Sequence, residues 1–249
     1  MTKIVNYYQK FVPGFVKKII DPDSGRIQDF VLSRIGQTTA LDRILDAGAG
    51  ECRNRKFITK QQYIAIDTTC GDNEWNYSNL DTIADLGKLP FKSNLFDLVI
   101  CTQVLEHIND PQHVLNELFR TTKTGGTICL TAPQGWGVHQ APFDFFRYTH
   151  FGLRYLMEKA GFEIISIVPS SGYFGYLANR LTVLPKTLFW QIKKKWIRLI
   201  LFPVELLAYF FFVFFFPALL NSIDFLDRDK NYTLNYLVLG EKPPGKNEL

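Results

Sequence analysis

Short apolar runs alternate with segments of helical periodicity along most of the 249-residue chain. The apolar runs indicate strands at Arg43–Ala47, Gln62–Asp67, Ile83–Asp85, Phe96–Cys101, Thr127–Thr131, Phe162–Val168 and Tyr232–Leu239. Helices are predicted from a cap at Ser24 to Gly36, over Pro111–Thr122 and over Phe151–Ala160, with a short one within the polar residues 51–60. Apolar strands alternating with helices predict an α/β fold with a doubly wound, mostly parallel sheet.

A glycine-rich turn follows the first predicted strand. The strand stops at Asp46, and Gly48 and Gly50 follow with one residue between them. Glycines let backbone approach a ligand that side chains would exclude, and ligands of open α/β sheets bind at the carboxyl ends of the strands. Asp67, at the end of the second strand, suits a ribose diol because a carboxylate accepts from both hydroxyls. The turn therefore predicts a nucleotide-type ligand.

Four segments in order give the chain its family resemblance. They are Asp46–Gly50, Ala84–Phe91, Phe96–His107 and Thr124–Thr127. Together they resemble the class I S-adenosylmethionine-dependent methyltransferases, of the methyltransferase type 11 kind, over residues 40–168, although Cys52 stands where the family often has a third glycine. The resemblance implies a Rossmann-like seven-stranded sheet with an antiparallel last strand, and S-adenosylmethionine as cofactor.

The resemblance also implies which residues bind the cofactor. They are Asp46, Gly48, Gly50, Asp67, Thr68, Asp85, Leu86, Thr102 and Gln103. Asp67 is expected to hold the ribose, and Asp85 with the backbone after it to contact adenine. A nicotinamide-dependent reductase is the alternative enzyme, but its fingerprint needs glycine at position 53, where Arg53 stands.

Methyl transfer from a sulfonium is an in-line displacement, so much of its catalysis is positioning, and a base is needed only for a hydroxyl or similar nucleophile. The predicted catalytic bases are His107, His139 and Asp144, and His150 is expected only to cap a helix. Residues 142–149 resemble a segment of family members linked to glycan or lipid-linked glycan biosynthesis. The resemblance makes Arg147 and Tyr148 candidates for acceptor binding; the alternative is a packed aromatic lid.

Composition bears on metal binding, on the cellular compartment and on nucleic-acid binding. No metal is expected, because the histidines lack ligand spacing and the four cysteines show no C-x-x-C pair. Cys101 and Cys129 lie in apolar strands, where a thiol is inert, and reduced cysteines favour the cytoplasm. Residues 1–20 lack the apolar core of a signal peptide. A net charge of +4 gives little support to a nucleic-acid partner.

An apolar insertion precedes the last predicted strand. Leu199–Leu220 carries Glu205 as its only charge and follows a run of cations that contains no acid. Its length would span a bilayer, but residues 221–231 are polar and reach only about 36 Å when extended. We therefore predict a monotopic anchor, re-entrant or interfacial, bent at Pro203 and Pro217, on the cytoplasmic face of a membrane. A buried helix, a dimer interface and a true span are the alternatives.

These observations define three regions. Residues 1–168 with 232–241 form the expected methyltransferase domain, 169–231 the helical membrane-association element, and 242–249 a disordered tail. The expected function is methyl transfer to an amphipathic or lipid-linked acceptor, glycan-type acceptors included, at the cytoplasmic membrane face. A non-catalytic membrane-bound scaffold is the alternative from another class. The acceptor atom and the oligomeric state stay open.

Overall fold

The chain folds as two compact units, which are described separately. The computed structural model describes residues 21–59, 61–71 and 74–245. The sheet unit contains residues 27–168 and 235–245, and the helical unit contains residues 21–26 and 169–234. Residues 1–20 of the expected methyltransferase domain and 246–249 of the expected disordered tail lie outside the described residues.

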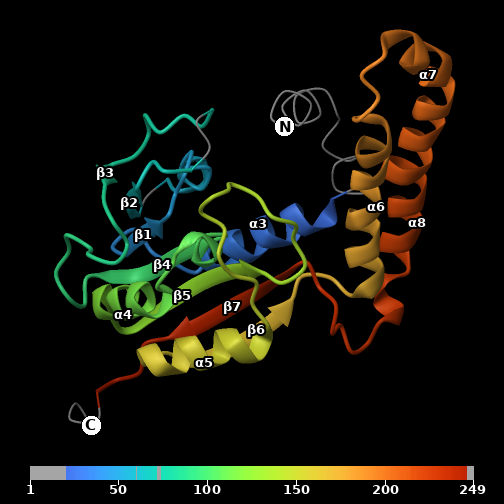
Figure 1. Ribbon diagram of the computed structural model, residues 1–249. Coiled ribbons are helices and arrows are strands. Elements are labelled where there is room, and N and C mark those ends of the chain that lie inside the picture. The colour runs from blue at the N-terminus through green and yellow to red at the C-terminus, as the bar shows by residue number, and fades with distance from the viewer. Residues whose placement is uncertain (1–20, 60, 72–73, 246–249) are drawn as a thin grey trace. The chain divides into compact units, whose positions relative to one another are not determined.

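The sheet has seven strands in the order β3-β2-β1-β4-β5-β7-β6. The strands are β1 Arg43–Ala47, β2 Gln62–Asp67, β3 Thr82–Ile83, β4 Phe96–Thr102, β5 Thr122–Pro133, β6 Glu163–Pro169 and β7 Asn235–Glu241. β3, β2, β1, β4 and β5 pair in parallel, and β7 pairs antiparallel with β5. The predicted fold is thus confirmed, and the order reverses at β1 and β4, whose carboxyl ends share one sheet edge (Figure 1).

Five strands differ from the prediction at their ends: β3, β4 and β6 by one or two residues, and β5 and β7 by more. β5 begins at Thr122, five residues early, because Thr122 pairs with Phe96 across an irregular register. β7 begins at Asn235 rather than at 232, because Asn235 is the residue that pairs with Pro133. Lys242, placed in the tail by the prediction, is held by the oxygens of Asn94, Phe119 and Thr122. The fold therefore includes the first residue of that tail.

Helices cover both faces of the sheet, as a doubly wound fold requires. Neighbouring residues of β1 serve opposite faces, since side chains alternate along a strand. Ile44 packs with Val31 and Ile35 of α3 (Pro22–Ile35). Leu45 belongs to the larger cluster, which also contains side chains of α4 (Pro111–Thr121) and α5 (His150–Ala160).

The start of α3 corrects one detail. The helix begins at Pro22, not after Ser24. Asp21 caps it, since its carboxylate accepts from the backbone N–H of Ser24 at 3.4 Å and from the Ser24 hydroxyl at 2.7 Å. Proline suits the first helical position because its missing N–H would have no partner there. The polar run 51–60 forms only a 3₁₀ turn, η1 (Arg55–Phe57).

The helical unit is an antiparallel hairpin. It consists of α6 (Tyr173–Phe189), α7 (Lys195–Tyr209), the π-helical segment η3 (Phe210–Phe215), α8 (Phe216–Ser222) and the 3₁₀ turn η4 (Asp224–Leu226). α6 packs along the run formed by α7, η3 and α8 (Figure 1). At the open end of the hairpin the buried Asp224 carboxylate accepts from the backbone N–H groups of Gly172 and Gly175, so it caps α6.

The two prolines of the insertion do not break it. Pro203 lies inside α7, and Pro217 lies at the start of α8. The irregularity is η3, directly before Pro217. A proline ring would collide with the carbonyl of Val213 in a regular α-helix, and the wider π turn relieves this collision. The predicted bend is therefore replaced by one long helical run.

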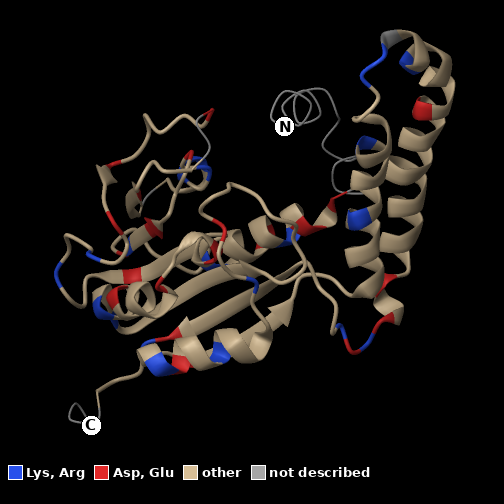
Figure 2. Cartoon of the chain, viewed as in Figure 1, with Lys and Arg blue, Asp and Glu red and all other residues tan. Residues whose placement is uncertain are grey.

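The surface of this run is unusually apolar. Among the described residues, Trp196–Leu226 is long and apolar enough to cross a membrane by length and composition, and very little of it is buried. Most of its outward-facing side chains are Leu, Ile, Val or Phe. Figure 2 shows α7 and α8 almost free of charged residues beyond the start of α7. An exposed apolar surface of this extent marks an interaction site.

Candidate functional site

The glycine turn after β1 has a backbone that only glycine adopts easily. Gly48 has φ +77° and Gly50 has φ +52°. A Cβ on Gly48 would lie 2.4 Å from a methyl group of Val104, so the turn packs directly against the segment that follows β4. The sequence signal for a ligand-binding turn therefore corresponds to a turn at the sheet edge in which two positions carry no side chain.

Asp67 organises this turn. Its carboxylate accepts from the backbone N–H of Gly50 at 2.9 Å and from that of Thr69 at 2.8 Å. The two N–H groups bond to different carboxylate oxygens, so each oxygen keeps a lone pair for a further hydrogen bond. The arrangement fits the predicted ribose acceptor, because a diol beside the turn would meet a carboxylate already fixed in place. Thr68, the neighbouring predicted residue, is exposed.

Asp46 lies differently from what a direct ligand contact requires. It is only 2% exposed, and its Oδ2 accepts from the Tyr63 hydroxyl at 2.5 Å and from the Asn54 amide at 3.0 Å. Burial raises the pKa of the Asp46 carboxyl. Through these hydrogen bonds Asp46 holds the turn against β2. Its contact with the cofactor stays a prediction.

The other predicted cofactor residues follow β3 and β4. The Asp85 carboxylate accepts from the Gly87 N–H at 2.8 Å and is exposed, whereas Leu86 is buried. Gln103 has φ +56°, and its amide donates to the Thr131 hydroxyl at 3.1 Å. Thr102 is the last residue of β4. All four thus lie at or beyond the carboxyl end of a strand, as predicted.

One aromatic residue near the turn was missed. Atoms of the Trp75 ring lie 3.1 Å from a Cβ built on Gly50 and 2.9 Å from one built on Gly71. Its indole therefore packs on the glycine turn and forms part of the candidate cofactor site. Nothing in the polar stretch around Trp75 indicates this, because the approach depends on how the loop after β2 folds back.

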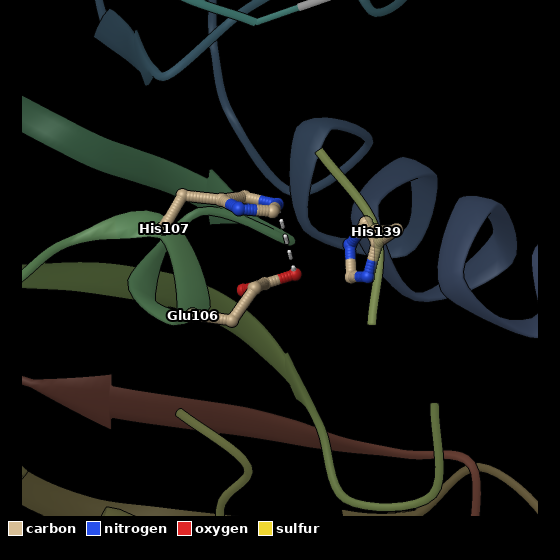
Figure 3. Close-up of side chains that lie close together, drawn as sticks. All are labelled: Glu106, His107 and His139. Carbon is tan, nitrogen blue, oxygen red and sulfur yellow. Dashed lines mark ion pairs between the residues drawn. The ribbon is translucent and has the colours of Figure 1, made fainter. Parts of the chain in front are cut away.

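The second part of the candidate site is a cluster of three side chains (Figure 3). Glu106 and His107 belong to η2 (Leu105–His107), just beyond β4, and His139 belongs to the loop after β5. The two imidazole rings meet edge to face with centroids 4.8 Å apart. His107 Nε2 lies 3.8 Å from a carboxylate oxygen of Glu106. Val104, which packs on Gly48, links this cluster to the glycine turn.

His107 is a neutral hydrogen-bonding group here. His107 Nδ1 lies 2.5 Å from the carbonyl oxygen of Phe143. Because a carbonyl only accepts, this nitrogen carries the proton and Nε2 presents a lone pair. Burial lowers the pKa of His107, which keeps the ring unprotonated near neutral pH. The ring thus fits the predicted role of a base.

Asp144 and Arg147 hold the loop that carries His139. Their side chains form a two-pronged ion pair with distances of 2.7 and 2.8 Å. Arg147 also donates to the backbone oxygens of Trp136 and Gly137. The hydrogen bond from Arg147 holds the pKa of Asp144 far below its usual range. A carboxylate so stabilised is a poor base, so the structure favours a positioning role for Asp144 over the predicted catalytic one.

Tyr148 and His150 are likewise positioned by the fold. Tyr148 is buried, and its hydroxyl donates to the Leu105 carbonyl at 2.9 Å. This places it under η2 with only 6% of its surface exposed, which disfavours its predicted role in binding the acceptor. Thr149, not His150, caps α5 by accepting from the Gly152 N–H at 3.1 Å. His150 packs against the ring of Tyr236.

Glu106 is the functional candidate that the sequence analysis overlooked. It is fully buried, and neither carboxylate oxygen has a hydrogen-bond partner among the described residues. Burial raises its pKa to about 8. The available signal was an acid directly before His107 in a segment otherwise apolar enough to be core, but its lack of a partner is a tertiary fact.

This pKa gives a measurable pH dependence. In the unfolded chain a glutamate titrates near about 4.3, so between that pH and about 8 the folded state retains a proton that the unfolded state has lost. The contribution of Glu106 to the free energy of unfolding therefore falls as pH rises, by up to about 1.4 kcal/mol per unit. We expect Glu106→Gln to remove this fall, as measured by urea unfolding from pH 5 to 8 in EDTA.

Glu117→Gln is the matched control. The hydrogen bond from Arg120 lowers the pKa of Glu117, so its stabilising contribution is present at neutral pH and is lost on acidification. From pH 5 to 8 the difference in free energy of unfolding between Glu106→Gln and the natural protein should therefore change with pH. The difference for Glu117→Gln should stay constant, because Glu117 titrates below this range. Parallel stability curves for Glu106→Gln and the natural protein over this range would contradict the assignment.

Comparisons with known proteins agree with this geometry. The family model described as "Methyltransferase domain" matches residues 45–130. This stretch begins in β1 and ends in β5, so it contains the glycine turn, Asp67 and Glu106 with His107. A demethylmenaquinone methyltransferase of Streptomyces avermitilis is 35% identical over 106 residues, which cover 42% of this chain and 42% of that relative.

Solved structures share the fold. A SAM-dependent methyltransferase from Archaeoglobus fulgidus superposes with a TM-score of 0.55 at 15% identity, covering 96% of this chain and all of that one (100%). Phosphoethanolamine N-methyltransferase 2 of Haemonchus contortus, solved with S-adenosyl-L-methionine, has a TM-score of 0.51 at 18% identity and covers 94% of this chain and 61% of that one. Both likenesses concern the arrangement of the backbone.

Proposed function

Because this chain is a class I S-adenosylmethionine-dependent methyltransferase whose domain match runs from residue 45 to 130, we propose that it methylates an amphipathic or lipid-linked acceptor at the cytoplasmic face of a membrane. The observation that carries the proposal is the exposed apolar helical run Trp196–Leu226 within the same chain. The reductase and scaffold alternatives have no comparable support in the family match.

Different residues of the sheet unit have different roles in the proposed reaction. Bound S-adenosylmethionine supplies a methyl group that an acceptor lone pair attacks, so that a bond to the acceptor forms and the carbon–sulfur bond breaks with its electrons left on sulfur. The Asp67 carboxylate would hold the ribose, and the glycine turn would let the ligand approach the backbone of the protein closely. His107 and His139 are placed to take the proton of an acceptor hydroxyl. Asp144 and Arg147 keep His139 in place.

The cluster of Glu106, His107 and His139, which we call the acceptor cluster, has an apolar rim. The loop after β5 that carries His139 exposes aromatic side chains at Trp136, Phe143, Phe145 and Phe146. Exposed aromatic rings beside polar groups suit an acceptor with an apolar body and a polar reacting end. This supports an amphipathic acceptor independently of the helical hairpin.

The hairpin supports attachment to a membrane surface rather than insertion through it. The sequence argument against a span relied on a return through residues 221–231, but α6 lies antiparallel to the apolar run and offers another path. The distribution of charges favours attachment at the surface. α6 carries Arg180 and Lys186, and Lys193 and Lys194 stand at the closed end of the hairpin. Carrying these cations through hydrocarbon is costly, whereas at the surface they meet anionic headgroups.

We infer the side of the membrane from the cysteines and the basic residues of the chain. All four cysteines are free, and Cys70 is exposed. Free thiols persist in a reducing compartment, and basic residues beside apolar segments favour the cytoplasmic face. These features support a location at the cytoplasmic face.

The proposal is tested with methyl-labelled S-adenosylmethionine and a membrane-lipid extract. We expect label to enter a lipid-phase product, because the acceptor cluster has an apolar rim. Mass spectrometry should find that product heavier by one methyl in place of one hydrogen. Separate incubations with free glycans and with demethylmenaquinone, for which one relative is named, identify the acceptor class.

Asp67→Ala is the control, since it should not bind the cofactor. Label that appears only in water-soluble products, and is absent with Asp67→Ala, would overturn the lipid acceptor while leaving methyl transfer intact. Label that Asp67→Ala transfers equally well would come from a contaminating enzyme.

A further inference from the structure

The Glu106 carboxylate lacks a compensating partner in a buried site. Its exposed fraction is 0%, and both oxygens are without a hydrogen-bond partner among the described residues. The ring nitrogen of His107, at 3.8 Å, is too distant for a hydrogen bond. Burying an uncompensated charge costs several kcal/mol. A bound proton or a bound cation must therefore accompany this group.

Two imidazoles face the same carboxylate. One ligand atom from each of Glu106, His107 and His139 lies within 4.8 Å of the other two, and the three side chains converge on one space (Figure 3). His107 presents its Nε2 lone pair because its Nδ1 donates to the Phe143 carbonyl. The cluster thus offers nitrogen and carboxylate oxygen, the ligands of borderline divalent metals.

The second histidine is oriented in the same way. His139 Nδ1 lies 3.1 Å from the Gly137 carbonyl and 3.5 Å from an Asp144 oxygen. Arg147 Nη2, at 3.4 Å, already donates to that carbonyl and to Asp144. Nδ1 of His139 therefore carries the proton, which leaves Nε2 as a free ligand atom. An oxygen acceptor behind a histidine is the arrangement that orients metal ligands in proteins.

We propose that Glu106, His107 and His139 bind one divalent first-row transition metal ion of the Zn²⁺ or Mn²⁺ class. Two nitrogens and one carboxylate leave coordination positions open for an acceptor oxygen. Magnesium and calcium prefer all-oxygen sites. The inference rests on the proposed function only for the use of the ion, which at the acceptor end would lower the pKa of a hydroxyl before methylation. With the ion bound, both Nε2 lone pairs are occupied, so this effect of the ion takes the place of proton removal by His107 and His139.

Binding requires a small closure. Ligand atoms around a tetrahedral ion with bonds of 2.0–2.1 Å lie about 3.4 Å apart, whereas the present atoms are separated by up to 4.8 Å. His139 belongs to the irregular segment between β5 and α5, which Asp144 and Arg147 hold, so the closure requires a shift of the His139 side chain on that segment. Glu106 and His107 are fixed in η2 by the backbone N–H groups of Phe145 and Phe146, which donate to the Glu106 carbonyl.

The test uses the full chain after treatment with a chelator and its removal. Calorimetry with ZnCl₂, MnCl₂ and MgCl₂ should give one Zn²⁺ or Mn²⁺ per chain and much weaker binding of Mg²⁺. We expect Glu106→Gln and His139→Gln each to weaken Zn²⁺ binding by about 100-fold or more, since each removes one of three ligands. A Cys70→Ser background removes the exposed thiol as a competing Zn²⁺ ligand.

Controls separate the outcomes. His113→Gln changes a histidine outside the cluster and should bind Zn²⁺ as the natural protein does. Binding of S-adenosylhomocysteine, measured on each variant, reports an intact sheet edge. Cobalt(II) bound to the unmutated chain should show the visible bands of nitrogen and oxygen ligation, which tests the site without any substitution.

The proposal is overturned if the natural protein binds no Zn²⁺ or Mn²⁺ in calorimetry. It is also overturned if binding persists in both variants, or if cobalt shows only the spectrum of the hydrated ion. A proton on Glu106 would then be the compensating group. Metal binding without lipid methylation would refute the proposed function alone, and lipid methylation by metal-free protein would refute the metal's use.

Discussion

Asp67→Ala is expected to lower the affinity for S-adenosylhomocysteine by at least about 100-fold. The carboxylate fixes the glycine turn through Gly50 and the following loop through Thr69, and its remaining lone pairs are the predicted acceptors for the ribose. Hydrogen bonds to a charged acceptor contribute about 1.5–3 kcal/mol each, so the loss of two corresponds to this factor or more. Calorimetry on the full chain measures it.

Two further variants identify the cause. Asp67→Asn retains an acceptor oxygen but loses the charge and one accepting position, so its affinity should lie between those of Asp67→Ala and the natural protein. Asp29→Asn alters an exposed acid on α3 and should leave the affinity unchanged. Circular dichroism must show that Asp67→Ala is folded. An affinity within about threefold of the natural value would show that Asp67 does not hold the ligand.

Four glutamines on the apolar run are expected to abolish binding to anionic lipid vesicles. The substituted residues are Leu199, Phe202, Leu206 and Phe210, which are 77%, 58%, 60% and 54% exposed. Burying a large apolar side chain contributes about 1.5–3 kcal/mol, so partial insertion of all four accounts for a loss of at least about 100-fold in partition. Glutamine is a good helix former, and the side of the run that faces α6 is unchanged. Co-sedimentation with vesicles measures the effect.

The control variant carries glutamine substitutions at exposed aromatic residues outside the apolar run. Phe151→Gln with Tyr155→Gln removes two exposed aromatic rings from α5, in the sheet unit, and should leave vesicle binding unaltered. Equal sedimentation of the four-glutamine variant and the natural protein would refute the membrane surface. If instead the natural protein ignores vesicles and the four glutamines convert a dimer to a monomer, the apolar run is an interface between copies of the chain.

Substitution is a sharper test than deletion of residues 199–220. The side chain of Glu205 is largely buried, and it accepts from Arg198 at 3.2 Å. Pro217, also buried, lies on the part of the run that packs along α6. Removing the segment would uncover α6 and disturb the helical unit, so loss of membrane binding would not identify the apolar surface as its cause.

The fold was predictable because its signals are local. A buried parallel strand needs a continuous apolar run, and the bounds of β1 and β2 agree with the prediction residue for residue. The glycine turn was visible because positive φ demands glycine at 48 and 50. Strand ends at β5 and β7 were less accurate, since Thr122 and Asn235 are strand residues only through their partners Phe96 and Pro133.

The candidate site was predictable only in part, for a related reason. Residues at the ends of consecutive strands share an edge by topology, so Asp67 and Asp85 could be placed from their positions alone. A side chain's role also depends on its hydrogen-bond partners, which lie elsewhere in the chain, as for Asp46, Asp144 and Tyr148. Periodicity carries no information about such partners.

The sequence by itself determined where most strands lie along the chain, and it determined the glycine turn and the apolar run. Each of these features depends only on residues that are neighbours in the chain. Only the tertiary structure decided that Glu106 is buried without a partner and that His139 meets it from the loop after β5. It also decided that α6 packs along the apolar run. These are encounters between segments distant in the chain, and the free energy of packing the whole fold, not local propensity, selects them.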